Sequence, residues 1–143
     1  MPAQSSNYAP VTMLRTEFET SVETLQNQTI VNSGKIYVFD DFLFINEVNK
    51  GFHVFDYSNA ENPVPLCFIN TPGATDVSIK NGMLYINQAV DLITLKYNSD
   101  TKIFDVLYRN TNVFPQKISP DGFEFYDINA NEIIVGFNLN STK

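Results

Sequence analysis

The sequence holds few side chains of the types that perform catalysis. His53 is the only histidine and Cys67 the only cysteine, and both lie inside short apolar runs where a structural role is expected. One histidine and one cysteine cannot supply a zinc site of the usual kind. The counts allow a Ser-His-Asp triad, but no nucleophile-elbow sequence or glycine-rich phosphate loop accompanies it. We therefore assign no catalytic, cofactor-binding or metal-binding residue and predict that the chain is not an enzyme.

Polar residues recur in matching pairs at the ends of two apolar runs. They are Asn46 with Glu47, and Asn87 with Gln88. If the two runs are equivalent strands, these four side chains lie on one rim of the fold and could bind a ligand. Calcium is the less favoured ligand because no spaced acidic loop of the EF-hand type is present. The sequence therefore predicts a ligand rim rather than an active site.

The charge pattern limits the classes of partner that the chain could bind. The net charge is −7, and the nine Lys and Arg residues are scattered, whereas nucleic-acid binding requires basic clusters. No apolar run approaches the roughly 20 residues of a transmembrane helix. We predict no nucleic-acid partner and no insertion of this chain into a membrane, and we find no signal peptide at its start. The remaining partners are an unidentified protein or a glycan.

The elements that would position the rim are short strands. From Gly34 onward, apolar runs are separated by turn-forming residues, which is typical of strands joined by hairpins. Asp40-Asp41 is expected to form one of the turns. The runs are apolar at successive positions, so we expect sheets that are covered on both faces, with the aromatic side chains in the core. The first four runs are Ile36-Tyr37-Val38-Phe39, Phe42-Leu43-Phe44-Ile45, Phe52-His53-Val54-Phe55 and Leu66-Cys67-Phe68-Ile69.

The pattern repeats with a period of about 41 residues. The string that begins at Ile36 matches the string that begins at Val77, and the later strands follow at similar offsets. A period near 40 with four short strands is typical of a β-propeller blade. We predict an all-β fold of antiparallel, blade-like sheets, with blade one at about 34–70 and blade two at about 75–110. A partial third blade is predicted at about 121–138, with strands at 125–128 and 132–137.

The N-terminal part is expected to differ. Residues 1–12 are polar and contain proline, which predicts an extended or mobile lead-in before a single β-repeat domain at 13–143. A helical stripe follows, and it predicts one or two helical turns, with Thr16 and Glu19 as a capping box. The stripe consists of Leu14, Phe18, Val22 and Leu25.

Two strings carry a more specific resemblance. They are Gly51-Phe52-His53-Val54-Phe55-Asp56-Tyr57-Ser58-Asn59 with Pro63, and Thr71-Pro72-Gly73-Ala74-Thr75-Asp76-Val77. Their spacing resembles the LVIVD repeat over residues 34–98, and the flanks resemble LVIVD-containing envelope proteins of Bacteroidetes type, often lipid-anchored. The resemblance implies a propeller and a periplasmic or outer-surface location, but no known activity. The second copy departs from the pattern, because Lys96 stands where the first has Asp56.

Length leaves the closure of such a propeller open. A closed ring needs at least about four blades, and this chain has two and part of a third. It could be a fragment of a larger propeller, close by association with another chain, or form an open stack covered by residues 14–25. We favour the covered stack. As function we predict a non-catalytic recognition or scaffold module of a bacterial cell envelope that acts through a blade rim or edge. The alternative is a carbohydrate- or small-ligand-binding module.

Overall fold

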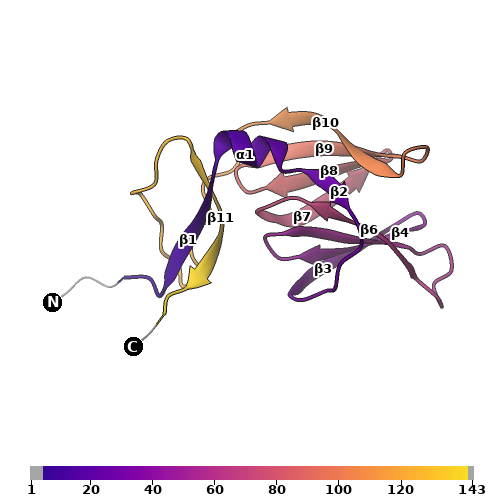
Figure 1. Ribbon diagram of the computed structural model, residues 1–143, viewed down its shortest axis with the longest axis horizontal. Helices are drawn as coiled ribbons and strands as arrows, with labels where there is room; N and C mark the ends of the chain where they lie inside the picture. Colours follow the sequence, from indigo (N-terminus) through magenta and orange to yellow (C-terminus); the bar gives the residue numbers. More distant parts are fainter. Residues whose placement is uncertain (1–4, 142–143) are drawn as a thin grey trace.

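The computed structural model describes residues 5–141, and almost all its regular structure is antiparallel β-strand, which confirms the all-β prediction. Two larger sheets stack on one another, and a two-stranded sheet lies beside them (Figure 1). We call these the first sheet, the second sheet and the terminal ribbon.

The first sheet has the strand order β2 (Glu23–Leu25), β6 (Val64–Asn70), β5 (Gly51–Asp56), β4 (Phe42–Glu47) and β3 (Ser33–Phe39). The second sheet has the order β10 (Ile103–Asn110), β9 (Asp91–Asn98), β8 (Met83–Gln88) and β7 (Ala74–Lys80). The terminal ribbon pairs β1 (Tyr8–Leu14) with β11 (Glu132–Leu139).

The two larger sheets contain the same hairpin. Ile36 lies opposite Ile45 in β3–β4, and Val77 lies opposite Ile86 in β7–β8, so residues 41 positions apart occupy equivalent places. The other pairs of the two hairpins follow the same correspondence up to the turns. The repeat detected in the sequence therefore builds two sheets of like register.

The turns of these hairpins have the expected chemistry. Asp40 has a φ of 50° in the first turn, and Asn81 has a φ of 52° in the second, followed by Gly82 at 76°. Asp, Asn and Gly tolerate the left-handed region because they relieve or avoid the steric clash of a Cβ there. The predicted turn at Asp40-Asp41 is confirmed.

The main core lies between the two sheets. Successive side chains of a strand point to opposite faces, so every second residue of the first sheet faces the second sheet. We call this side the front face of the first sheet; it is defined by Tyr37, Phe44, Val54 and Cys67. Phe44 is 1% exposed, and the rings of Tyr97 and Phe104 from the second sheet lie 4.9 Å apart in the same core. Cys67 is buried as predicted, and burial raises the pKa of its thiol to about 11.

The opposite side of the first sheet is not covered as predicted. We call it the back face; its cross-strand rows are Ile36-Ile45-His53-Phe68 and Val38-Leu43-Phe55-Pro65. Ile36 is 62% exposed and Val38 is 57% exposed. The prediction that both faces are covered is wrong here, because an apolar run shows what a strand can bury but not whether a neighbour is present.

The second sheet also has an uncovered side, which we call its free face. Its cross-strand rows are Ser78-Tyr85-Thr94 and Lys80-Met83-Lys96. These rows are largely polar, and Ser78 and Lys96 are exposed. The two outer surfaces of the stack therefore differ in chemistry.

The predicted short helix is present as α1 (Arg15–Thr20), which bridges the terminal ribbon and the sheets (Figure 1). Phe18 is fully buried and packs with Val90 and Ile133 in a second, smaller core. No helix of residues 5–141 is long and apolar enough to cross a membrane.

The rest of the stripe behaves differently from the prediction. Leu14 is 43% exposed, and β2 begins at Glu23, so the helix ends before the last two members of the stripe. The capping box predicted at Thr16 and Glu19 is wrong. Both residues lie inside the helix, and it is Glu17 whose carboxylate accepts a hydrogen bond from the backbone N–H of Leu14, at 3.4 Å.

The terminal ribbon joins the two ends of the described chain. Residues 8–12, predicted to be an extended or mobile lead-in, belong to β1 and pair with the C-terminal strand β11. Pro10 is compatible with this place because β1 is an edge strand. Residues 1–4 lie outside the described residues.

The predicted partial third blade is corrected. Residues 125–128 lie in the loop between β10 and β11, where Tyr126 is 83% exposed and Phe125 packs on Phe137 at 5.6 Å. β11 does form, but β1 supplies its partner from the other end of the chain. The predicted region 121–138 therefore contributes one strand, β11, which pairs with the N-terminal strand β1 and not with residues 125–128.

Candidate functional site

The structure brings the four predicted rim residues to one end of the stack, next to the terminal ribbon. Asn46 and Glu47 end β4, and Asn87 and Gln88 end β8. The side-chain N–H of Asn46 donates to the backbone oxygen of Ala74, which lies opposite Gln88 in the second sheet. Asn46, Glu47 and Gln88 are at most 4% exposed. These three side chains therefore stabilise the rim from inside the fold and are not available at its surface to contact a ligand.

The two asparagines hold backbone together. Asn46 also donates to the backbone oxygen of Gly51, at 3.0 Å, across the β4–β5 turn. Asn87 donates to the hydroxyl of Thr75 at 3.1 Å, next to the bulge in β7. The amide nitrogens of both asparagines are thus engaged within the fold.

Glu47 forms a buried pair with His53. The Nε2 of His53 lies 2.7 Å from Oε1 of Glu47, and both side chains are at most 5% exposed. The carboxylate also accepts the backbone N–H groups of Val31 at 3.0 Å and Asn32 at 2.5 Å. Burial opposes the charge, but these hydrogen bonds outweigh it and lower the pKa of Glu47. The pair fixes the segment before β3 against the first sheet.

The equivalent end of the second sheet uses a different ionic cluster. Asp91 is fully buried and pairs with Arg15 at 2.5 Å and Arg109 at 2.7 Å. Arg109 also donates to Gln88 at 3.0 Å. Burial opposes the charge of Asp91, but the hydrogen bonds from both arginines and from the backbone N–H of Asn112 lower its pKa.

This cluster fastens α1 to the second sheet. The guanidinium carbons of Arg15 and Arg109 lie 5.6 and 5.3 Å from the centre of the Phe18 ring, a distance typical of cation–π contact. Gln88 also donates to the hydroxyl of Ser21, just past the helix, at 3.4 Å. The predicted rim residue Gln88 is therefore part of a structural clamp.

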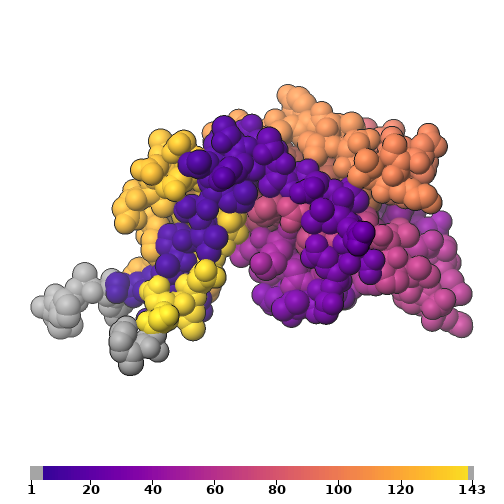
Figure 2. All heavy atoms as spheres, in the orientation of Figure 1, coloured from indigo at the N-terminus to yellow at the C-terminus, as the bar shows by residue number. Residues whose placement is uncertain are grey.

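A cleft of about 650 Å³ opens beside these clamps, between the terminal ribbon and the first sheet. Figure 2 shows the hollow between the N- and C-terminal strands and the strands of the first sheet. Amide side chains from several elements contribute to its wall, which is bordered by two aromatic residues, Phe68, which is 2% exposed, and Phe137, whose ring packs on Phe125. The amides are those of Gln28, Asn32, Asn49, Asn70 and Asn138. Lys50 is the one charged residue among those that line it, so the cleft is polar and almost uncharged.

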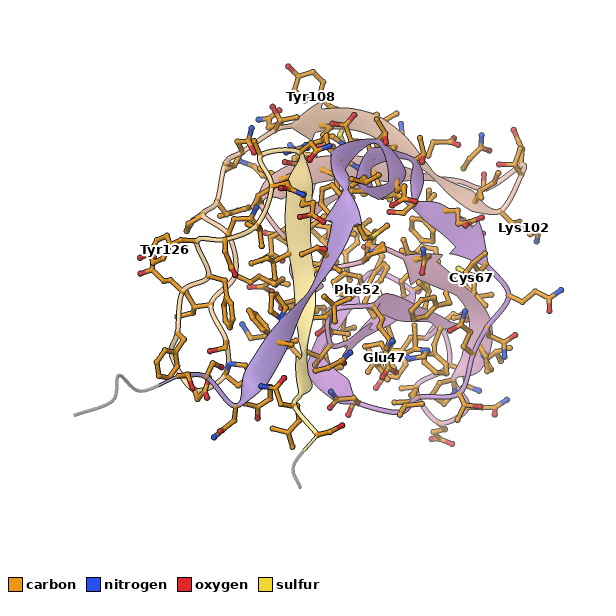
Figure 3. All side chains as sticks on the ribbon, turned by 60° about the vertical axis from the view of Figure 1, so that its left-hand side comes forward. Glu47, Phe52, Cys67, Lys102, Tyr108 and Tyr126 are labelled. Atoms are coloured by element: carbon orange, nitrogen blue, oxygen red, sulfur yellow. The ribbon has the colours of Figure 1, made fainter. Side chains whose placement is uncertain are left out.

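Of the four predicted rim residues, Glu47 lies directly behind this cleft. Glu47 holds Asn32, a lining residue, and His53 packs edge-on against Phe68 at 4.9 Å. Figure 3 shows Glu47 and Phe52 inside the molecule beside the terminal ribbon, whereas Tyr108 and Tyr126 project outward.

Asn49 is a lining residue whose backbone is held in the left-handed region. Its φ is 62°, its N–H donates to the oxygen of Ala74 at 3.0 Å, and its oxygen accepts from Gly73 at 2.8 Å. Among residues 5–141, its buried Oδ1 has no hydrogen-bond partner. Asn49 and Lys50 lie in the turn between β4 and β5, and nothing in the local sequence indicates that the distant ribbon would close a cleft over them.

The comparisons with known proteins give no relative. No family model, curated protein or solved structure matches the chain. Within residues 5–141, no three His, Cys, Asp or Glu side chains gather in a group that could hold a metal ion.

Proposed function

We propose that the chain is a non-catalytic recognition module that binds an uncharged polar ligand, a glycan by preference, in the cleft between the terminal ribbon and the first sheet. The observation that carries the proposal is the lining of this cleft by amides and aromatic rings, with Lys50 as the only charge. Its volume of about 650 Å³ falls within the range of small-ligand sites, about 300–1,000 Å³.

The chemistry of the wall suits sugars. A primary amide both donates and accepts hydrogen bonds, as a sugar hydroxyl does, and aromatic rings offer apolar surface to sugar C–H groups. Gln28 approaches from the segment before β3 and Asn138 from the terminal ribbon, so a ligand would be held from two sides. The buried pairs behind the wall fix the geometry, which lowers the entropy cost of binding.

The proposal extends to the finer fold. The two large sheets are interpreted as consecutive blades of a propeller-type stack, supported by their shared hairpin register and front-to-back packing. This packing is equally compatible with the alternative, in which the chain is a piece of a larger propeller. The relation to LVIVD repeats and the cell-envelope location remain predictions that rest on the sequence resemblance.

The test is a titration of the ¹⁵N-labelled protein with neutral hexasaccharides of glucose, N-acetylglucosamine and mannose, followed by amide chemical shifts. We expect one class to shift the signals of Asn49, Asn70 and their neighbours. Alanine at Gln28 or Asn138, both exposed, should weaken binding about five- to ten-fold, the effect of one lost hydrogen bond. Asn110→Ala, an exposed amide on β10, is the matched control and should bind as the parent does.

Two results would overturn the proposal. One is the absence of any shift at the cleft with all three sugars at millimolar concentration. The other is binding whose shifts map away from the cleft and which persists in both cleft variants.

A further inference from the structure

The back face of the first sheet is an apolar surface whose counterpart in the repeat is buried. Ile36 corresponds to Val77, and they are 62% and 4% exposed. Ile45, which is half-buried, corresponds to Ile86, which is fully buried. The residues of the second sheet are covered by the front face of the first sheet, whereas the back face has no such neighbour among residues 5–141.

Beyond the end where Glu47 and His53 lie under the segment before β3, the back face is continuous and apolar. Its cross-strand rows place Ile36 beside Ile45, and Val38 beside Leu43 and Phe55. The segment before β3 covers only one end of the face, where Glu47 holds it down. That segment adds another apolar side chain, since Val31 is 84% exposed.

The chemistry of the other surfaces decides which occupant fits. A head-to-tail copy would bring the free face of the second sheet onto the back face and bury Lys80 and Lys96 against aliphatic side chains. Burying a charge without a partner costs several kcal/mol, so this stacking is disfavoured. A second back face is apolar over the same rows and leaves no charge unpaired.

We propose that the chain forms a two-fold symmetric dimer in which the back faces of two first sheets pack against each other. The contact is isologous, so each residue of the back face is buried twice, once in each copy. Two twisted sheets that pack face to face in this way form an ordinary β-sandwich interface. The cleft borders the back face at Phe68, whereas Val38, Leu43 and Phe55, at the centre of the proposed contact, do not line it.

The test is sedimentation equilibrium of the whole chain over a range of concentrations. The monomer mass is 16.2 kDa, and we expect a species of twice this mass at micromolar concentrations. Val38→Lys and Ile36→Lys should each raise the dimer dissociation constant at least about 100-fold, because each introduces two charges into the contact. Both positions are more than half exposed in the monomer, so the fold should survive, as circular dichroism would show.

Thr94→Lys on the free face is the matched control and should leave the dimer intact. A parent chain that stays monomeric at hundreds of micromolar would overturn the proposal. So would a dimer that resists both back-face variants. Loss of association in Thr94→Lys would indicate head-to-tail stacking instead and would equally refute the two-fold arrangement.

Discussion

The first and second sheets share a hairpin register but differ at the residues that decide what each sheet contacts. Phe44 and Tyr85 are equivalent, yet Phe44 is buried between the sheets and Tyr85 lies on the free face. At the rim, Glu47 pairs with a histidine, whereas its equivalent Gln88 joins a cluster of Asp91 with two arginines.

These differences separate two roles of the repeat. The register, set by short apolar runs and the turns between them, is common to both sheets. The residues at the sheet ends and outer faces have diverged, and each set fixes a different nonrepeated segment. Glu47 and His53 hold the segment before β3, while Asp91 holds α1.

The largest expected effect is a difference in stability loss between a substitution on the front face of the first sheet and one on the free face of the second sheet. Phe44→Ala should lower the free energy of unfolding by about 3–5 kcal/mol, because it leaves a cavity in the aromatic core. Tyr85→Ala, at the equivalent place on the free face, should cost less than about 1 kcal/mol. Urea denaturation monitored by circular dichroism measures both, and similar losses in the two variants would contradict the comparison.

The next effect concerns the ionic cluster of Asp91 with Arg15 and Arg109. Asp91→Ala should destabilise the protein by about 2–4 kcal/mol, because it leaves two partly buried guanidinium groups without their carboxylate. Hydrogen exchange should show the loss concentrated in α1 and β10. Asp127→Ala, an exposed carboxylate in the loop before β11, is the control and should be neutral. A loss below about 1 kcal/mol for Asp91→Ala would show that Phe18 alone holds the helix.

The smallest effect is the pH dependence of the Glu47 pair. The pKa of Glu47 is lowered in the folded chain, so its contribution is present above about pH 4.3, the unfolded value. It is lost as the pH falls through the lower, folded value. Glu47→Gln should cost about 1–3 kcal/mol at pH 7, because its amide group opposes the N–H donors of Val31 and Asn32.

Measurements of the free energy of unfolding at low pH test the role of the ionised Glu47 carboxylate most directly. The stability gap between the parent and Glu47→Gln should narrow as the pH falls from about 5 to 2, since both side chains are then uncharged. Glu61→Gln, on an exposed turn, should track the parent at every pH. A gap that stays constant down to pH 2 would show that the ionised carboxylate of Glu47 does not contribute.

The predictions from sequence were most accurate where the signal is local. The hairpins around Asp40 and Asn81, the short helix and the burial of Cys67 all follow from patterns within about ten residues. The prediction of a strand at residues 125–128 is wrong, because these residues lie in a loop in which Phe125 packs on Phe137. The four predicted rim residues do lie at one end of the stack, but none of them lines the cleft, which the sequence did not predict.

The strands, the turns and the 41-residue repeat can all be found in the amino-acid sequence, since apolar runs and turn chemistry act between near neighbours. Three features become visible only in the folded molecule: β1 pairs with β11, Arg15 meets Asp91, and the back face of the first sheet stays open. These features depend on segments far apart in the chain, whose association is governed by the packing of the whole molecule and leaves no local pattern. The cleft arises for the same reason, because its two walls come from strands at the ends and from turns in the middle of the chain.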